Sequence, residues 1–173
     1  MQRFIIRLLL RALAAAFLPI VAAVAADDRP SLCTPAETAI FSCAVGGKIV
    51  SLCGSRDLSA TAGSMTYRYG RKGAIELTYP ETPAHPREAF TAAVVGMSAG
   101  GGDFVRFVRS DVTYTLYALI FRGVGEDDGL VISRAGKTIS KRKCKDYALG
   151  AGAWGAMYQA KLPADPGQSI EPE

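Results

Sequence analysis

The sequence MTYRYGRKGAIELTY, residues 65–79, decides the fold class, because apolar and polar side chains alternate on both sides of a turn. The alternating members are Met65, Tyr67, Tyr69, Ile75, Leu77 and Tyr79. Successive side chains of a β-strand point to opposite faces, so this period of two is typical of strands that bury one face. The GRKG segment at 70–73 supplies a tight turn. These 15 residues therefore predict an antiparallel hairpin.

The same alternation recurs from residue 39 to residue 143, and no comparable window has helical periodicity. Gly46-Gly47 and Ala135-Gly136 are candidate hairpin turns. Strands are further predicted at 89–97, 103–109, 112–122, 130–134 and 137–143. Short connections make consecutive strands antiparallel neighbours. We therefore expect an all-β fold, an antiparallel β-sandwich or small barrel of about nine strands, stabilised by disulfides.

The first 26 residues have the pattern of a secretory signal peptide. Arg3, Arg7 and Arg11 precede an apolar stretch that ends in small residues before Asp27. The alternative is an uncleaved anchor, although the apolar stretch 11–24 is shorter than the roughly 20 residues that span a bilayer. We expect a signal peptide at 1–26, a single β domain at 27–147 and a periplasmic or secreted protein without stable membrane insertion after cleavage.

The basic character of the chain comes largely from the expected signal peptide. The whole sequence carries a net charge of +4, and the three arginines of residues 1–26 account for most of it. A nearly neutral mature chain argues against a nucleic-acid partner, which requires a concentrated basic face. The basic run at 137–145 is typical of a solvated strand edge that discourages aggregation.

The four cysteines, Cys33, Cys43, Cys53 and Cys144, are expected to form two disulfides, for which three connectivities exist. If Gly46-Gly47 closes a two-residue hairpin, Cys43 faces Val50, whereas Cys53 lies across from Ile40 on the other side of the sheet. Cys43 and Cys53 should then not pair with each other. Our preferred pairing is Cys33 with Cys53 and Cys43 with Cys144.

Two regions interrupt the strand pattern. Residues 80–88 contain three prolines and are predicted to form a loop. Residues 148–173 form a C-terminal tail, rich in Ala and Gly and then in Pro, that we expect to be partly disordered beyond about residue 160. Within it, Trp154 and Tyr158 could dock a short helix on the sheet, although three nearby glycines weaken that helix.

The best candidate for a binding site is the segment from Ser98 to Arg106. A five-residue connection at 98–102 would place Gly100, Gly101 and Gly102 at a hairpin tip, where a partner can approach the backbone closely. The alternative is a flexible turn without a ligand. A nucleotide-phosphate loop is disfavoured, because no Gly-Lys-Ser/Thr ending and no helix follow the glycines.

Arg106 lies two positions after Phe104 and therefore on the same strand face, with Asp103 at the start of the strand. An arginine beside an aromatic ring at the base of the loop could bind a carboxylate. Equally, Arg106 could lie along an apolar surface or pair with Asp103 or Asp111. We take Ser98, the three glycines, Asp103, Phe104 and Arg106 as the candidate partner-binding residues.

Catalytic chemistry finds little support in the sequence. The single histidine, His85, lies in the proline-rich loop, and four paired cysteines leave no free thiolate. The carboxylates at 126–128 are expected in a loop before Gly129, where solvation or weak calcium binding is more typical than glycosidase chemistry. A structural zinc site lacks a close cysteine pair. We expect neither an enzyme nor a cofactor or metal site.

An ordered set of motifs, FSC at 41–43, KIVSLC at 48–53, YRYG at 67–70 and the segment 98–107, resembles a family of small exported proteins of Gram-negative bacteria whose function is uncharacterised. The resemblance covers residues 33–144 and implies an exported β domain. The chain is also loosely similar to the periplasmic lysozyme inhibitors, whose loop pattern is Ser-Gly-x-x-Tyr. Here Ser98 is followed by Ala99, and the nearest aromatic residue is Phe104.

Together these observations predict an exported, non-enzymatic binding protein that acts through a glycine-rich hairpin loop on another protein, with a lysozyme as the candidate partner. The alternative is a structural or envelope-associated protein without a dedicated loop site. A hydrolase that depends on His85 is the third reading.

Overall fold

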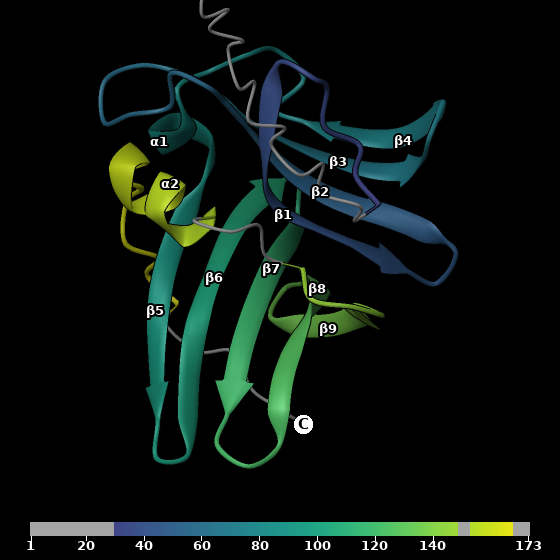
Figure 1. Cartoon of the computed structure of the whole chain (residues 1–173), viewed down its shortest axis with the longest axis vertical. Helices are drawn as coiled ribbons and strands as arrows, with labels where there is room; N and C mark the ends of the chain where they lie inside the picture. Colours follow the sequence, from purple (N-terminus) through teal and green to yellow (C-terminus); the bar gives the residue numbers. More distant parts are fainter. Residues whose placement is uncertain (1–29, 149–152, 168–173) are drawn as a thin grey trace, which may run out of the picture.

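The computed structural model describes residues 30–148 and 153–167. The expected signal peptide at 1–26 lies outside the described residues. Nine strands form two antiparallel sheets, with the orders β1-β2-β3-β4 and β5-β6-β7-β8-β9 (Figure 1). The strands are β1 Glu37–Val45, β2 Lys48–Ser55, β3 Met65–Arg71, β4 Ala74–Tyr79, β5 Thr91–Met97, β6 Gly100–Arg109, β7 Val112–Phe121, β8 Gly125–Arg134 and β9 Lys137–Lys143. The all-β prediction is confirmed, as a sandwich rather than a closed barrel.

The first sheet follows the hairpin predictions closely. Val45 pairs with Lys48 across Gly46-Gly47, and both glycines have positive φ, as this tight turn requires. Cys43 pairs with Val50 as expected. Cys53 instead pairs with Ala39, because the register shifts between Ala39 and Phe41 at a bulge.

The second sheet is a meander of five strands whose hairpins differ from the prediction at two places. The connection between β5 and β6 is only Ser98-Ala99, so the expected five-residue loop at 98–102 is wrong and the three glycines belong to β6. Strand β8 begins at Gly125, so the carboxylates at 126–128 lie in a strand and not in a loop. The turn at Ala135-Gly136 and strand β9 are confirmed.

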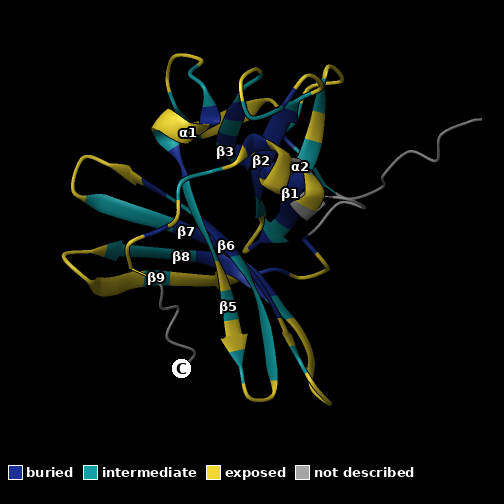
Figure 2. Ribbon diagram, turned by 90° about the vertical axis from the view of Figure 1, so that its left-hand side faces the viewer, coloured by how far each residue is buried: buried dark blue, intermediate teal, exposed yellow. Residues whose placement is uncertain are grey.

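The main core lies between the first sheet and the upper part of β6, β7 and β8 (Figure 2). Alternate residues of β2, β3, β4, β6, β7 and β8 supply it, as the period of two demands. Phe107 lies at its centre, with its ring 4.3 Å from the ring of Tyr79, 4.8 Å from Tyr67 and 4.8 Å from Tyr114. Such stacked and tilted aromatic contacts tie the two sheets together.

Both predicted disulfides are present, Cys33–Cys53 and Cys43–Cys144. The second one brings residues 144–148 beside the outer edge of β1. There the amide of Ser42 donates to Ala148 O at 2.7 Å and that of Lys145 donates to Ala44 O at 3.1 Å. The edge of β1 is therefore covered by chain from beyond β9.

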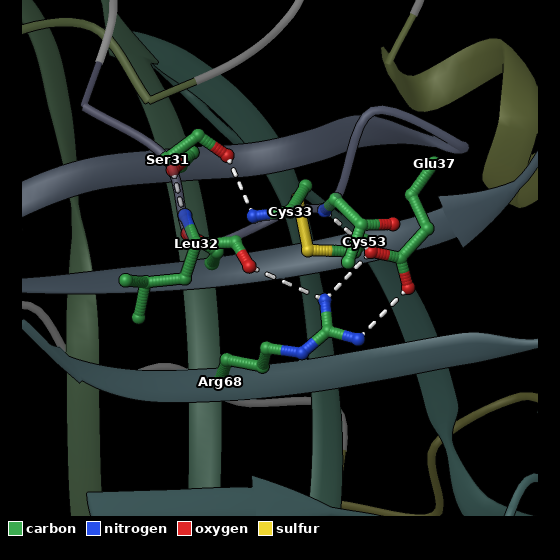
Figure 3. Close-up of polar contacts among 9 residues, drawn as sticks. Ser31, Leu32, Cys33, Glu37, Cys53 and Arg68 are labelled. Atoms are coloured by element: carbon green, nitrogen blue, oxygen red, sulfur yellow. Dashed lines mark hydrogen bonds and ion pairs between the residues drawn. A yellow bond between two sulfur atoms is a disulfide. The ribbon is translucent and has the colours of Figure 1, made fainter. Parts of the chain in front are cut away.

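The Cys33–Cys53 disulfide holds the segment before β1 across the first sheet (Figure 3). The amide of Leu32 donates to Ser51 Oγ at 3.0 Å, and Arg68 reaches Leu32 O at 3.4 Å. Arg68 also donates to both carboxylate oxygens of Glu37, at 2.7 and 2.9 Å. This two-pronged ion pair fixes the start of β1 against β3.

The proline-rich region and the tail contain more structure than predicted. Helix α1, Pro86–Ala89, ends the expected loop, with His85 as its N-cap. Helix α2, Ala153–Ala160, is the predicted short helix, and Met157 and Ala160 are its buried contacts, whereas Tyr158 is exposed. No helix in the described part of the chain is long and apolar enough to cross a membrane.

Within the tail, which the sequence predicts to be partly disordered beyond about residue 160, residues 163–167 form an arm docked on the second sheet. Ala92 donates to Pro163 O at 3.0 Å and accepts from the amide of Asp165 at 2.9 Å, which makes a parallel bridge between Ala92 and Ala164. This C-terminal arm, residues 163–167, thus covers the first part of the β5 edge.

Candidate functional site

Two hairpins of the second sheet extend beyond the first sheet and end side by side. Figure 1 shows the β5–β6 and β7–β8 turns at the end of the molecule opposite the β1–β4 sheet. Gly100 of β6 pairs with Phe121 of β7, so the two turns are neighbours in the sheet. We call residues 98–99 and 122–124 the paired tips.

Backbone hydrogen bonds join the paired tips to each other. The amide of Arg122 donates to Ala99 O at 2.6 Å, and the amide of Val124 donates to Phe121 O at 3.1 Å. Gly123 has a φ of 79°, the positive value that the third position of a type II turn requires. The tips are thus linked across the two hairpins instead of being independent loops.

The side chains at the tips are exposed and partly apolar. Val124 is 86% exposed and Ile120 is 60% exposed, while Ser98 and Arg122 also face solvent. An isolated exposed apolar residue is ordinary, but Ile120 near the end of β7 and Val124 in the β7–β8 turn place two on one projecting hairpin, where they form a contact surface. With a guanidinium and a hydroxyl beside them, these residues can make both apolar and polar contacts with a concave partner.

The structure separates the residues that the sequence grouped into one site. Ser98 lies at the tips, but Gly100 and Gly102 are inner-strand residues that allow β6 and β7 to approach closely. A Cβ atom at Gly100 would collide with Ile120 O, and one at Gly102 would collide with Ala118 O. At Gly101 the nearest atom to a Cβ would be Val95 O, at 2.8 Å. These glycines serve strand packing, a reading that the glycine-loop interpretation overlooked.

Phe104 and Asp103 both make contacts within the protein. Phe104 is completely buried, in a small second core with Tyr117 and Leu119 on the face of the sheet away from β1–β4. Asp103 accepts a hydrogen bond from the hydroxyl of Tyr158 at 3.2 Å. Burial raises the pKa of Asp103, and the Tyr158 hydrogen bond opposes that rise.

Arg106 shares a face with Phe104, as predicted, and its guanidinium carbon lies 4.6 Å from the centre of that ring. It does bind a carboxylate, but the partner is Asp165 of the C-terminal arm, at 2.5 Å, and not Asp103 or Asp111. Arg106 Nε also donates to Thr115 Oγ1 at 3.0 Å, and Nη1 donates to Gly167 O at 2.8 Å. The residue therefore anchors the arm.

Asp165 and the exposed residues Ile120, Arg122 and Val124 are the features that sequence reasoning missed. Gly123 and Gly125, on either side of Val124, were a turn signal in the sequence that pointed to a second tip. Nothing in the sequence spacing links Asp165 to Arg106, because the two residues are 59 positions apart.

His85, on which the hydrolase alternative depends, caps the start of α1. Its Nδ1 accepts a hydrogen bond from the amide of Arg87 at 3.4 Å, while Nε2 is buried without a partner among the described residues. The ring thus caps the first turn of the helix.

Comparison with known proteins adds no assignment, since no family model, curated protein or solved structure matches this chain.

Proposed function

We propose that this protein is an exported, non-enzymatic binding protein whose paired tips insert into a cleft of another protein. The observation that carries the proposal is the pair of projecting turns, joined by the Arg122–Ala99 hydrogen bond, with Val124 exposed in one turn and Ile120 exposed beside it on β7. A linked pair of turns loses little conformational entropy on binding, which favours affinity. The two disulfides support folding in an oxidising compartment outside the cytoplasm.

The partner we propose is a lysozyme, in keeping with the resemblance to the periplasmic lysozyme inhibitors. A glycosidase of this kind works with two carboxyl groups in an open cleft. Arg122 can pair with one of these carboxyl groups, and Ser98 can donate a hydroxyl hydrogen bond. Ile120 and Val124 would then lie against the apolar walls. In this proposal Arg122 binds the carboxylate of the lysozyme in place of Arg106, because Arg106 is paired with Asp165.

A cell-wall lysis assay tests this proposal. The oxidised protein without residues 1–26 is added to lysozymes of the animal and invertebrate types. The double variant Arg122→Ala, Val124→Ser removes an exposed guanidinium and an exposed apolar side chain from the tips. We expect this variant to raise the inhibition constant by about tenfold or more, as the loss of a binding hot spot does. Val108→Ser is the matched control, because Val108 is a 54% exposed valine on β6 far from the tips.

The outcomes separate the possible functions. Inhibition that depends on Arg122 and Val124, but not on Val108, supports the proposal. Inhibition unaffected by the tip variant would remove the tips from the mechanism. No inhibition of either lysozyme at micromolar protein would remove the lysozyme assignment and favour a structural or envelope-associated protein.

A further inference from the structure

A polar groove of about 770 Å³ lies on the second sheet, at the end opposite the paired tips. Its floor is made by side chains on the sheet face that turns away from β1–β4, and its rim includes α1 and the C-terminal arm. Its floor includes two cations and four hydroxyl side chains, which are Arg106, Thr113, Thr115, Ser133, Thr138 and Lys141. We refer to this feature as the polar groove.

Two cations of the groove floor, Arg106 and Lys141, lie on opposite sides of the polar groove. Arg106 pairs with Thr115, Thr115 with Val131, and Val131 with Lys141. Residues paired across antiparallel strands point to the same face, so Arg106 and Lys141 share the floor, three strands apart. In a flat sheet this separation is about 14 Å, and curvature of the sheet shortens it.

Arg106 is held in place with part of its guanidinium unused. Its Nε and Nη1 bind Thr115, Asp165 and Gly167, whereas Nη2 has no hydrogen-bond partner among the described residues. The ring of Phe104 lies under the guanidinium, 4.6 Å from its central carbon. The arginine is thus preorganised, with two N–H groups available to an acceptor in the groove.

Hydroxyl groups form the neighbouring row of the same sheet face, whereas Thr115 and Val131 lie between the two cations in their own row. Thr113 pairs with Ser133, and Ser133 pairs with Thr138, which places three hydroxyls in the row beside Arg106 and Lys141. None of these three hydroxyls makes a hydrogen bond within the part of the chain that the structure describes. Each can act as donor and acceptor, as the hydroxyls of a saccharide do.

We propose that the polar groove binds an acidic oligosaccharide. Arg106 Nη2 and Lys141 would bind carboxylates, and the hydroxyls of Thr113, Ser133 and Thr138 would bind sugar hydroxyls along the neighbouring row. Asp165 stays in place, because it neutralises the other side of the Arg106 guanidinium. The site is independent of the paired tips, since Arg106 lies six residues along β6 from Gly100, about 20 Å away.

Calorimetric titration at low salt tests this site with the full mature protein and three probes. They are an oligogalacturonate, a neutral chito-oligosaccharide of the same length, and an oligoglutamate peptide of matched charge. We expect the oligogalacturonate alone to bind. Lys141→Gln should raise its dissociation constant by about fivefold, the effect of one solvent-accessible ion pair. Lys137→Gln on the same strand is the control, because it removes the same charge outside the groove.

The test has clear contrary results. Absence of oligogalacturonate binding overturns the proposal, as does equal weakening by Lys141→Gln and Lys137→Gln, which would indicate only non-specific charge attraction. Equal or tighter binding of the oligoglutamate would overturn the saccharide assignment in favour of an acidic peptide. Equal binding of the neutral chito-oligosaccharide would show that Arg106 and Lys141 do not select an acidic ligand, which also overturns the proposal.

Discussion

Arg106 illustrates how a residue can have the predicted chemistry with an unpredicted partner. The sequence indicated a carboxylate-binding arginine on the face of Phe104, and both properties are present. The carboxylate itself comes from Asp165, whose side chain is only 3% exposed. A local pattern such as 103–107 carries no information on a partner supplied by a distant segment, so the sequence could not show that Arg106 pairs with Asp165.

Removing that carboxylate should destabilise the protein. Asp165→Ala leaves Arg106, 19% exposed, without its counter-charge, and also removes acceptors for Thr91 and Gly167. We expect a loss of about 2–3 kcal/mol in the free energy of unfolding, measured by urea denaturation. Glu81→Ala, which breaks the exposed Arg109–Glu81 pair, is the control and should leave the urea midpoint unchanged. Equal midpoints for the two variants would contradict this account.

Glu37 makes a pH-dependent contribution to stability. Burial opposes its ionisation, but hydrogen bonds from Arg68 and Thr34 outweigh burial, so its pKa is lowered from the ordinary value. The unfolded chain therefore binds a proton at higher pH than the folded protein does. The stabilisation is complete above the ordinary glutamate pKa and is lost as pH falls through the lowered pKa.

Comparison with Glu37→Gln isolates this contribution. The difference in unfolding free energy between the native protein and the variant should be largest near neutral pH and should shrink as pH falls below about 4. Urea denaturation at a series of pH values measures it. A difference that is constant over the series would show that the carboxylate charge of Glu37 does not stabilise the fold.

At the scale of elements, the sequence predicted strands well wherever alternation and turn glycines agreed. The hairpins closed by Gly46-Gly47 and Ala135-Gly136 are examples. Prediction failed at Gly100, Gly101 and Gly102, because glycine signals both turns and close strand approach, and only the register distinguishes them. It failed also for Phe104, because the burial of an outer sheet face is not visible in a period of two.

Gly102→Ala tests the packing role of these glycines. The added methyl group would collide with the backbone of Ala118, so β6 or β7 must shift, at a cost of about 1–3 kcal/mol. Gly96→Ala on β5 is the matched control, because its Cβ would have no atom within 4 Å and should cause no loss. Thermal unfolding of both variants gives the comparison. Equal melting temperatures would contradict a packing role for Gly102.

At the scale of the whole molecule, the two disulfides differ in the length of chain that they close. Cys43–Cys144 spans 101 residues and Cys33–Cys53 spans 20. A longer closed loop removes more conformational entropy from the unfolded chain. Hairpin geometry excluded a Cys43–Cys53 bond and left two connectivities, of which the preferred one is present.

Paired serine variants should show that difference. Replacing Cys43 and Cys144 should cost about 5 kcal/mol of unfolding free energy, and replacing Cys33 and Cys53 about 3 kcal/mol. Denaturant unfolding of the two double variants measures both values. The opposite order would mean that loop length does not decide the effect. The native contacts of the segment around Leu32, which Cys33 holds in place, would then stabilise the fold by more than the difference in loop-closure entropy.

The two segments that cover the sheet edges also determine when the fold can be completed during synthesis. The edge of β1 is covered by residues 144–148, and the edge of β5 is covered by residues 163–165, so both sheets have an edge that stays open until these segments have been made. A ribosome-bound chain that ends before residue 144 has all nine strands but neither cover. In such a chain the outer backbone groups of β1 and β5 have no covering segment, so the two sheets are completed last at these two edges.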